Sequence, residues 1–539
     1  MNFILRFLKK GEIERLLKEG NKLLEEKDYE KALSLFDKVL SYDNTNLCAK
    51  YGKGKCFYFL NAFEKAKPIL VEIEKDSKNT FFECYYYLYK IELENGDIFD
   101  AIKYLTKYID KGKDKVSALK LRSELNFKFE KYLDVIDDCE KVLNASPDDM
   151  DAFKLMIKSR IKTDQLKKAL IDVNKALENY GNSPDLLNIR SYLRYLNRNY
   201  SDALNDIKIA ISLNNYFPDS YYTIALIQTK VNQQKEALEN LNKALELNPN
   251  YADAYIVRAE LFTQFDKPDE ALSDYKKVLE YFPDNADYHF KSGKLNMLLF
   301  DFNAAKINFE TSLILDPSNA VYMFYLSNAF RELKRYKEQK DYLDRALELK
   351  PDYEDAMLEL GKLFYKAKAF KEANKILDKL ISINPENRQA YFYRAKVKEQ
   401  LADNYGANSD YTIALLDPNY LEAWIARALL KVSRSDFHGA VLDLNKAISL
   451  RPQNGNIYIY RAKALVKLEK QAEAYDDFAK ALEILPSNVE CYYYRGFINF
   501  DMRRFKNAVL DWEKAVSLKP DLAAKLNDNI AKAKLKIGS

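Results

Sequence analysis

The chain has 539 residues, and its 85 Lys and Arg nearly balance its 81 Asp and Glu, which leaves a net charge of +4. This balance gives no electrostatic footprint for nucleic acid, and the low counts of 14 Gly and 14 Pro argue against a β-sandwich, a collagen-like chain or a long disordered tail. Hydrophobic residues make up 47% of the chain, which is enough for a large buried core.

The N-terminal segment, residues 1–12, is predicted to be a lead-in or cap. Its apolar run is interrupted by Arg6, and it lacks the hydrophobic region and the small-residue cleavage site of a secretory signal. The longest stretch without charge, 317–330, has 14 residues, whereas a membrane-spanning helix needs about 20 apolar residues. We therefore expect no membrane association and a cytoplasmic location.

The cysteines support the same compartment. They are odd in number, lie far apart and form no C-x-x-C pair, so a complete set of intramolecular disulfides is excluded. We expect buried, reduced thiols at Cys48, Cys56, Cys84, Cys139 and Cys491.

A 34-residue period runs through most of the chain. Prolines at 249, 283, 317, 351 and 385 are 34 residues apart, and after one step of 33 residues the series continues at 418, 452, 486 and 520. Between these turns, each unit carries two stretches of about 14 residues in which apolar residues recur at spacings of three and four. Alternation of period two fits neither stretch, so each unit is predicted to be a helical hairpin.

Two positions in the regular units are small. In the first helix they are Ser191, Ala225, Ala259, Gly293, Ser327, Gly361, Ala395, Ala428, Ala462 and Gly496. In the second helix they are Ala169, Ala203, Ala237, Ala271, Ala305, Ala373, Ala407, Ala440, Ala474 and Ala508, with Gln339 as the exception. Small side chains at facing positions let two helices approach closely, and the aromatic residues beside them are interpreted as core.

This pattern resembles the tetratricopeptide repeat, whose signature combines aromatic and small residues in the first helix with Ala, an aromatic residue, Ala and Pro in the second helix and its turn. Residues 489–520 match it with Tyr492, Gly496, Ala508, Trp512, Ala515 and Pro520, and residues 421–452 match it with Trp424, Ala428, Ala440, Leu444, Ala447 and Pro452. The same register covers most of the chain and gives about fifteen tandem repeats.

The resemblance implies an all-α protein, an α-solenoid in which stacked antiparallel hairpins form a right-handed superhelix. Within it, we expect divergent repeats one to three at 13–115, regular repeats four to fifteen at 116–520, and a C-terminal capping helix at 521–539. Arrays of this kind need polar caps at their ends.

An Arg and an Asp occur together within individual repeats. The residue before the first-helix small position is Arg at 122, 190, 258, 394, 427, 461 and 495, and each is followed sixteen residues later by Asp. Among five units from 150 to 385 that lack this Arg, only one has the Asp, at 172. We therefore predict an Arg–Asp pair between the two helices of a hairpin; the alternative is that these Arg bind a ligand phosphate or carboxylate.

A ligand would contact the first helices, which the resemblance places on the concave face. On first-helix positions directed away from the packing sites we expect aromatic residues beside cations, a surface suited to an extended or helical peptide with acidic groups. The candidate peptide-binding residues are Tyr192, Tyr195, Tyr222, Phe290, Lys294, Phe324, Arg331, Lys362, Tyr365, Phe392, Lys396, Lys463, Tyr493 and Phe497. The alternative is that the rings pack between hairpins and the lysines only solvate the surface.

One known function of the family can be compared residue by residue. Co-chaperone members grip a C-terminal carboxylate with a Lys–Asn pair in one helix and further polar residues in the next two. Residues 16–33 resemble the opening of that module and Asn21 matches, but Leu17 replaces the Lys, with Lys18 one place away, and Gly52 stands where Asn is expected. Recognition of a terminal carboxylate is therefore not predicted.

The repeats leave no stretch for a catalytic domain, and the motifs of phosphate-binding loops, serine hydrolases and zinc proteases are absent. We expect no catalytic residue, metal or cofactor.

The predicted function is a non-enzymatic scaffold or adaptor that binds a protein or peptide partner, an acidic one fitting best. The alternatives are a co-chaperone-like or structural component that self-associates, and an accessory that binds a small molecule or nucleic acid; the repeat length and the charge balance disfavour nucleic acid. The oligomeric state stays open.

Overall fold

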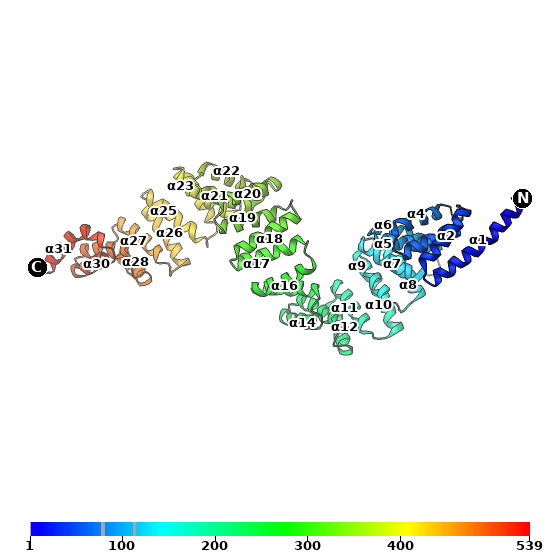
Figure 1. The fold of residues 1–539 in the computed structure, drawn as a ribbon. Helices are drawn as coiled ribbons and strands as arrows, with labels where there is room; N and C mark the ends of the chain where they lie inside the picture. Colours follow the sequence, from blue (N-terminus) through cyan, green and yellow to red (C-terminus); the bar gives the residue numbers. More distant parts are fainter. Residues whose placement is uncertain (1, 77–80, 112–114, 539) are drawn as a thin grey trace. The chain divides into compact units, whose positions relative to one another are not determined.

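The structure, a computed structural model, describes residues 2–76, 81–111 and 115–538. Within these ranges the chain forms 31 α-helices and one short 3₁₀ helix, and no strand. Successive α-helices pair into fifteen hairpins, and the last helix follows them alone (Figure 1). The fold is an all-α solenoid of stacked antiparallel hairpins, as the sequence predicts.

The chain divides into two compact units, residues 1–251 and residues 252–539. The first unit holds seven hairpins. Its helices are α1 (Asn2–Glu25), α2 (Tyr29–Tyr42), α3 (Leu47–Phe59), α4 (Phe63–Asp76), α5 (Cys84–Glu94), α6 (Ile98–Lys111), α7 (Lys115–Lys128), α8 (Tyr132–Ala145), α9 (Met150–Lys162), α10 (Leu166–Tyr180), α11 (Pro184–Leu196), α12 (Tyr200–Leu213), α13 (Pro218–Lys230) and α14 (Gln234–Leu247).

The second unit holds eight hairpins and the final helix. Its helices are α15 (Ala252–Gln264), α16 (Pro268–Tyr281), α17 (Ala286–Leu298), α18 (Phe302–Leu315), α19 (Ala320–Glu332), α20 (Tyr336–Leu349), α21 (Glu354–Lys366), α22 (Phe370–Ile383), α23 (Arg388–Gln400), α24 (Asn404–Ala414), α25 (Leu421–Ser433), α26 (Phe437–Leu450), α27 (Gly455–Lys467), α28 (Gln471–Ile484), α29 (Val489–Asp501), α30 (Phe505–Leu518), the 3₁₀ helix Pro520–Leu522 and α31 (Ala523–Gly538).

The ends of the chain were predicted to act as caps. Residues 2–12 form the first turns of α1, and residue 1 lies outside the described residues. At the other end, α31 buries Leu526, Ile530 and Ala533 in one cluster with Trp512 of α30. Residue 539 lies outside the described part of the chain.

A tight turn closes each regular hairpin. In the second unit the first helices are followed by residues with left-handed backbone, such as Phe300 and Ala402, whose φ angles are 60° and 62°. The amide of Asp301, just after Phe300, donates to the carbonyl of Asn296 at 2.9 Å, the six-to-one hydrogen bond of a Schellman motif. Because the turn is this short, the second helix must return along the first.

The predicted small positions are the points of closest helix approach. A Cβ on Gly293 would lie 2.5 Å from the Phe309 ring, and a Cβ on Gly496 would lie 2.4 Å from Trp512 Nε1. Phe309 and Trp512 are almost completely buried. Glycine at these positions therefore lets a large ring of the second helix lie directly against the backbone of the first.

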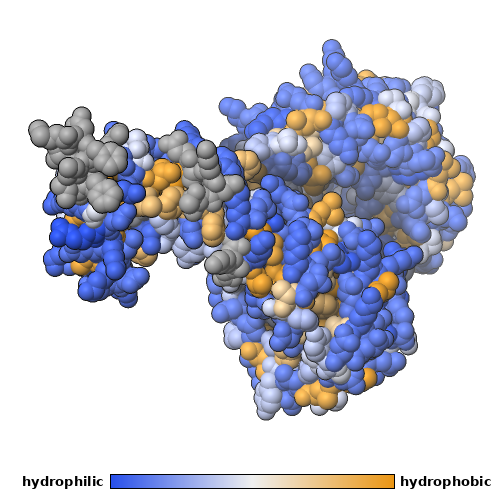
Figure 2. All heavy atoms as spheres, turned by 90° about the vertical axis from the view of Figure 1, so that its right-hand side faces the viewer, coloured by the Kyte–Doolittle hydropathy of each residue, from blue (hydrophilic) through white to orange (hydrophobic). Residues whose placement is uncertain are grey.

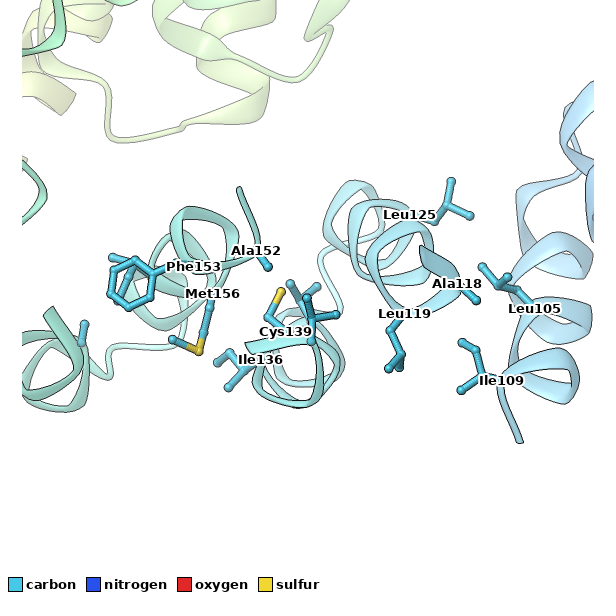
Figure 3. Packing of buried hydrophobic residues seen from close by; sticks show 14 of the residues in the cluster. Leu105, Ile109, Ala118, Leu119, Leu125, Ile136, Cys139, Ala152, Phe153 and Met156 are labelled. Atoms are coloured by element: carbon cyan, nitrogen blue, oxygen red, sulfur yellow. The ribbon is translucent and has the colours of Figure 1, made fainter. Parts of the chain in front are cut away.

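The core of the first unit is continuous between hairpins. In Figure 3, Leu105 of α6, Leu119 of α7, Ile136 of α8 and Met156 of α9 fill the spaces between four successive helices. Each hairpin thus buries apolar surface against the next one, and not within itself alone. This arrangement agrees with a repeat protein in which neighbouring repeats stabilise one another.

The surface agrees with the balanced composition. On the face drawn in Figure 2, hydrophobic residues form small separate patches on a mostly hydrophilic surface. Among the described residues, no helix has the length and apolar character needed to cross a bilayer.

Candidate peptide-binding surface

Seven of the hairpins contain an Arg–Asp pair that joins their two helices. In all seven predicted pairs the guanidinium donates two hydrogen bonds to one carboxylate, with Nε–Oδ2 distances of 2.8–3.0 Å and Nη2–Oδ1 distances of 2.6–2.7 Å. The Asp side chains are 1–7% exposed and the Arg side chains 14–23%. The guanidinium groups of these Arg are therefore already bound to Asp side chains within the fold, which argues against the alternative that they bind a ligand.

The same Arg residues also link successive hairpins. Arg394 Nη1 lies 2.7 Å from Asp378 of the preceding hairpin, and Arg461 Nη1 lies 2.7 Å from Asn445.

Asp172, which occurs without the usual Arg, is paired as well, because Arg160 Nε lies 3.2 Å from its carboxylate. Arg160 stands one helical turn beyond the usual Arg position, which explains why this Asp occurs without the usual Arg.

The candidate aromatic residues of the first unit are half-buried. Tyr192 stacks on Tyr195 with ring centroids 6.0 Å apart, and Tyr222 packs against Tyr251 at 5.0 Å. Burial raises the pKa of Tyr195 above its ordinary value. These rings therefore pack against one another or against the turn before α15, while part of each ring stays accessible.

In the second unit, one candidate belongs to the core. Phe392 is 7% exposed and packs on Tyr411 and Tyr420, with ring centroids 5.9 and 5.0 Å away. The interpretation of Phe392 as a surface residue is therefore wrong, because its position one turn before Ala395 directs it between two hairpins.

The other candidate rings of the second unit are half-buried. Phe290 contacts Tyr325 with centroids 5.0 Å apart, and Phe324 contacts Tyr353 at 5.3 Å. Tyr365 lies 6.0 Å from Phe370, and farther along the chain Tyr493 and Phe497 lie 5.1 Å apart.

Three of the five candidate cations already have a carboxylate partner. Arg331 Nη1 lies 2.8 Å from Glu359, and Lys362 Nζ lies 2.9 Å from the other oxygen of the same carboxylate. Burial alone would raise the pKa of Glu359, but Lys362 and Arg331 lower it below its ordinary value. Lys463 is paired with Glu490. The charge of these three cations is partly compensated within the protein.

Lys294 and Lys396 differ from the other three. Lys294 Nζ lies 5.5 Å from the centroid of the Tyr325 ring, and Lys396 Nζ lies 4.8 Å from that of Tyr365. Within the described part of the chain neither forms an ion pair with a carboxylate. An ammonium held above an aromatic face keeps its charge available for a ligand.

Two pockets lie along these first helices. The first, of about 510 Å³, is formed by α15, α16, α17 and α19 and is lined by Lys294, Met297, Leu298 and Tyr325 among others. The second, of about 200 Å³, lies between α19, α20, α21 and α23. Arg331 lines both pockets, so they adjoin one another.

The lining of the two pockets is positively charged. It contains the five cations Lys291, Lys294, Arg331, Lys362 and Lys366 but only the two carboxylates Glu260 and Glu359, a net charge of +3. Since the whole chain carries only +4 over 539 residues, this surface concentrates positive charge.

The structure thus brings together part of the predicted site. Lys294, Arg331, Lys362, Tyr365 and Lys396 lie on successive first helices of the second unit. Tyr192, Tyr195 and Tyr222 belong to the other unit, and Lys463, Tyr493 and Phe497 lie farther along the second. Sequence reasoning missed Tyr325, Lys366, Tyr393 and Gln339 as lining residues; the one available signal was Gln339 at a position held by Ala in ten other regular hairpins.

The repeated register is also found by comparison with known families. The tetratricopeptide repeat model matches residues 23–85, 228–295 and 330–396. These segments are in the register of the hairpins described above. The chain is a tetratricopeptide repeat protein. Outside the matched segments, five hairpins carry the same Arg–Asp pair, at Arg122, Arg190, Arg427, Arg461 and Arg495.

Solved structures give wide but distant similarity to this tetratricopeptide repeat protein. The Cut9–Hcn1 hetero-tetramer of the APC/C is 14% identical, covers 89% of this chain and 95% of its own, and has a TM-score of 0.37. Naa15/Naa10 bound to HypK-THB is 13% identical, covers 97% of both chains and has a TM-score of 0.37. YrrB, described as a TPR protein with an unusual peptide-binding site, is 23% identical over 35% of this chain and 98% of its own, with a TM-score of 0.31. No curated protein matches the chain.

Proposed function

We propose that this tetratricopeptide repeat protein is a non-enzymatic scaffold or adaptor, and that the first helices of residues 252–539 bind an acidic peptide segment of a protein partner. The observation that carries the proposal is the pair of lysines, Lys294 and Lys396, which are held above aromatic rings and form no salt bridge among the described residues. An acidic peptide would supply the missing negative charge, and the exposed edges of the rings would contact its apolar groups.

The distance between the two lysines sets the length of the peptide. They lie on α17 and α23, which are separated by three steps between neighbouring first helices. Packed helices lie about 8–10 Å apart, so the surface spans about 24–30 Å. An extended chain advances about 3.3 Å per residue and needs roughly eight residues to cover that span.

The exposed apolar residues of the first pocket complete the surface. Leu298 is 57% exposed beside Lys294 and Met297. A partner segment that alternates acidic and aliphatic residues would therefore match both the charge and the apolar area. Short-range charge attraction also makes the interaction dependent on ionic strength.

The co-chaperone-like alternative has less support. A Cβ at Gly52, where the carboxylate-binding module has Asn, would lie 2.4 Å from the ring of Phe36. A polar side chain at this position is therefore incompatible with the observed packing of α2 against α3.

The proposal predicts that charge reversal at both lysines abolishes binding of an acidic peptide. The probe is a fluorescein-labelled dodecapeptide of alternating Glu and Gly, and binding is measured by fluorescence anisotropy. Wild-type protein should bind it, and more weakly when NaCl is raised from about 0.15 M to about 0.5 M. The Lys294→Glu/Lys396→Glu variant should show no binding.

Matched controls separate this surface from general charge. Lys375 and Lys446 are exposed lysines on the second helices α22 and α26. Their reversal to Glu changes the net charge equally, and we expect it to leave binding nearly unchanged. Equal loss of binding in both double variants would contradict the proposed surface.

A further inference from the structure

One position in the second unit departs from the repeat in a way that the fold does not require. The second-helix small position is Ala in ten of the regular hairpins and Val135 in the first of them, and all eleven residues are fully buried. In the hairpin formed by α19 and α20 it is Gln339, which is only 2% exposed. A long polar side chain thus occupies a position where packing elsewhere accepts Ala or Val.

The amide of Gln339 lacks a partner. Its Oε1 is buried and, within the described residues, accepts no hydrogen bond. A buried amide oxygen that has lost water and found no donor is unfavourable, so such a group in a native structure calls for an explanation.

Gln339 lines the smaller of the two pockets, together with Glu359, Lys362, Lys366 and Tyr393 among others. This pocket has a volume of about 200 Å³, below the roughly 300–1,000 Å³ typical of sites for small molecules. It has room for one residue of a peptide. The unpartnered amide is therefore on the wall of a cavity that a ligand group can enter.

The pocket has an excess of positive charge. Its lining includes Arg331, Lys362 and Lys366 but a single carboxylate, Glu359, which is shared by Arg331 and Lys362. Lys366 is exposed at the end of α21 and forms no ion pair within the described chain. The wall of the pocket thus contains an amide oxygen, Oε1 of Gln339, that lacks a hydrogen-bond donor. Beside it lie cations that can pair with one more anion.

We propose that this pocket is a subsite for one Glu or Asp residue of the bound peptide. The residue places its carboxylate beside Lys362 and Lys366 and donates its main-chain N–H to Oε1 of Gln339. An ionised carboxylate has no hydrogen to donate, so the main-chain amide is the donor that such a residue carries. This inference rests on the proposed function and specifies the partner: a peptide with an acidic residue at the position that reaches α21.

The first test replaces Gln339 with Ala, the residue of ten other regular hairpins. Because the substitution removes a buried unpartnered amide, far-UV circular dichroism should be unchanged and the melting temperature should stay equal or rise. Affinity for the labelled Glu–Gly dodecapeptide should fall by about 5- to 10-fold, the effect of losing one hydrogen bond. Lys366→Ala should also weaken binding.

Lys467 provides the matched control. It occupies in α27 the position that Lys366 occupies in α21 and is likewise exposed, but the hairpin before it, α25–α26, has Ala440 at the position of Gln339. Lys467→Ala should leave the affinity unchanged.

A second test addresses the hydrogen bond itself. A dodecapeptide that is N-methylated at every Glu cannot donate these main-chain hydrogens. Wild-type protein should bind it more weakly than the plain peptide, whereas Gln339→Ala should bind both peptides equally. If N-methylation weakens both proteins by the same factor, the donor to Gln339 is refuted.

The outcomes also separate this inference from the proposed function. If wild-type protein binds the acidic peptide and both Gln339→Ala and Lys366→Ala bind it as tightly, the subsite is wrong and the peptide-binding surface stands. If wild-type protein does not bind the acidic peptide at all, the proposed function fails and the subsite with it.

Discussion

At the scale of single residues, the Arg–Asp pairs show how one side chain can stabilise two hairpins. Arg461 donates two hydrogen bonds to Asp477 within its hairpin and a third to Asn445 of the preceding one. The hydrogen bond with Asp477 raises the pKa of Arg461 above its ordinary value. The Asp477 side chain is only 7% exposed, so its carboxylate is shielded from water and contacts Arg461 instead.

Replacement of Arg461 by Leu should therefore be strongly destabilising. It leaves a buried carboxylate without a partner, which costs about 3–5 kcal/mol. Urea unfolding followed by circular dichroism measures the effect, and Arg461→Leu/Asp477→Leu should recover part of it. Lys446→Leu, on an exposed position of α26, should cost less than about 1 kcal/mol. A midpoint for Arg461→Leu equal to wild type would show that the pair does not stabilise the fold.

The cysteines also differ at this scale. Cys56, Cys84, Cys139 and Cys491 are buried as expected, whereas Cys48 is exposed at the start of α3. Burial raises the pKa of the Cys84 and Cys491 thiols to about 12, so at pH 8 they stay protonated and unreactive. The expectation of buried thiols is wrong for Cys48, because its position in the first turn of α3 lies outside the packing stripe.

We therefore predict that one thiol reacts rapidly with Ellman's reagent in the native protein at pH 8. The remaining four should react only after denaturation. Cys48→Ser should remove the fast phase and leave the slow one. Two or more fast equivalents in the wild-type protein would contradict the burial of the other cysteines.

At the scale of elements, α31 covers the last hairpin. Leu526 and Ala533 are fully buried, in one cluster with Val509 and Trp512 of α30. Without α31, that face of α30 would meet water, and burial of apolar area is the main source of stability in a repeat array.

Deletion of residues 523–539 should expose Trp512. In a Trp424→Phe background, the fluorescence of Trp512 should shift to longer wavelength and become accessible to iodide. The lowest melting transition should also move to lower temperature. Unchanged Trp512 fluorescence would mean that α31 is not needed to cover this hairpin.

At the scale of the whole molecule, the chain is built of two compact units that meet in sequence at Tyr251 and Ala252. All the residues of both pockets belong to the second unit. Its hairpins bury apolar surface against their neighbours, so the binding surface does not require residues from the first unit.

Residues 252–539 expressed alone should therefore remain helical and bind the acidic dodecapeptide with the affinity of the full chain. Circular dichroism and fluorescence anisotropy test the two parts of this prediction. A folded fragment without binding would show that the first unit contributes to the site.

The sequence alone determined the hairpins, their register, the small positions and all seven Arg–Asp pairs, because each depends on contacts at a fixed spacing that recurs in many copies. It placed most candidate cations on one surface for the same reason. Only the tertiary structure decided which of them are available: Glu359 compensates Arg331 and Lys362, whereas Lys294 and Lys396 face aromatic rings. These contacts join different repeats, vary from one repeat to the next, and depend on where long side chains end in space, which a repeating pattern does not encode.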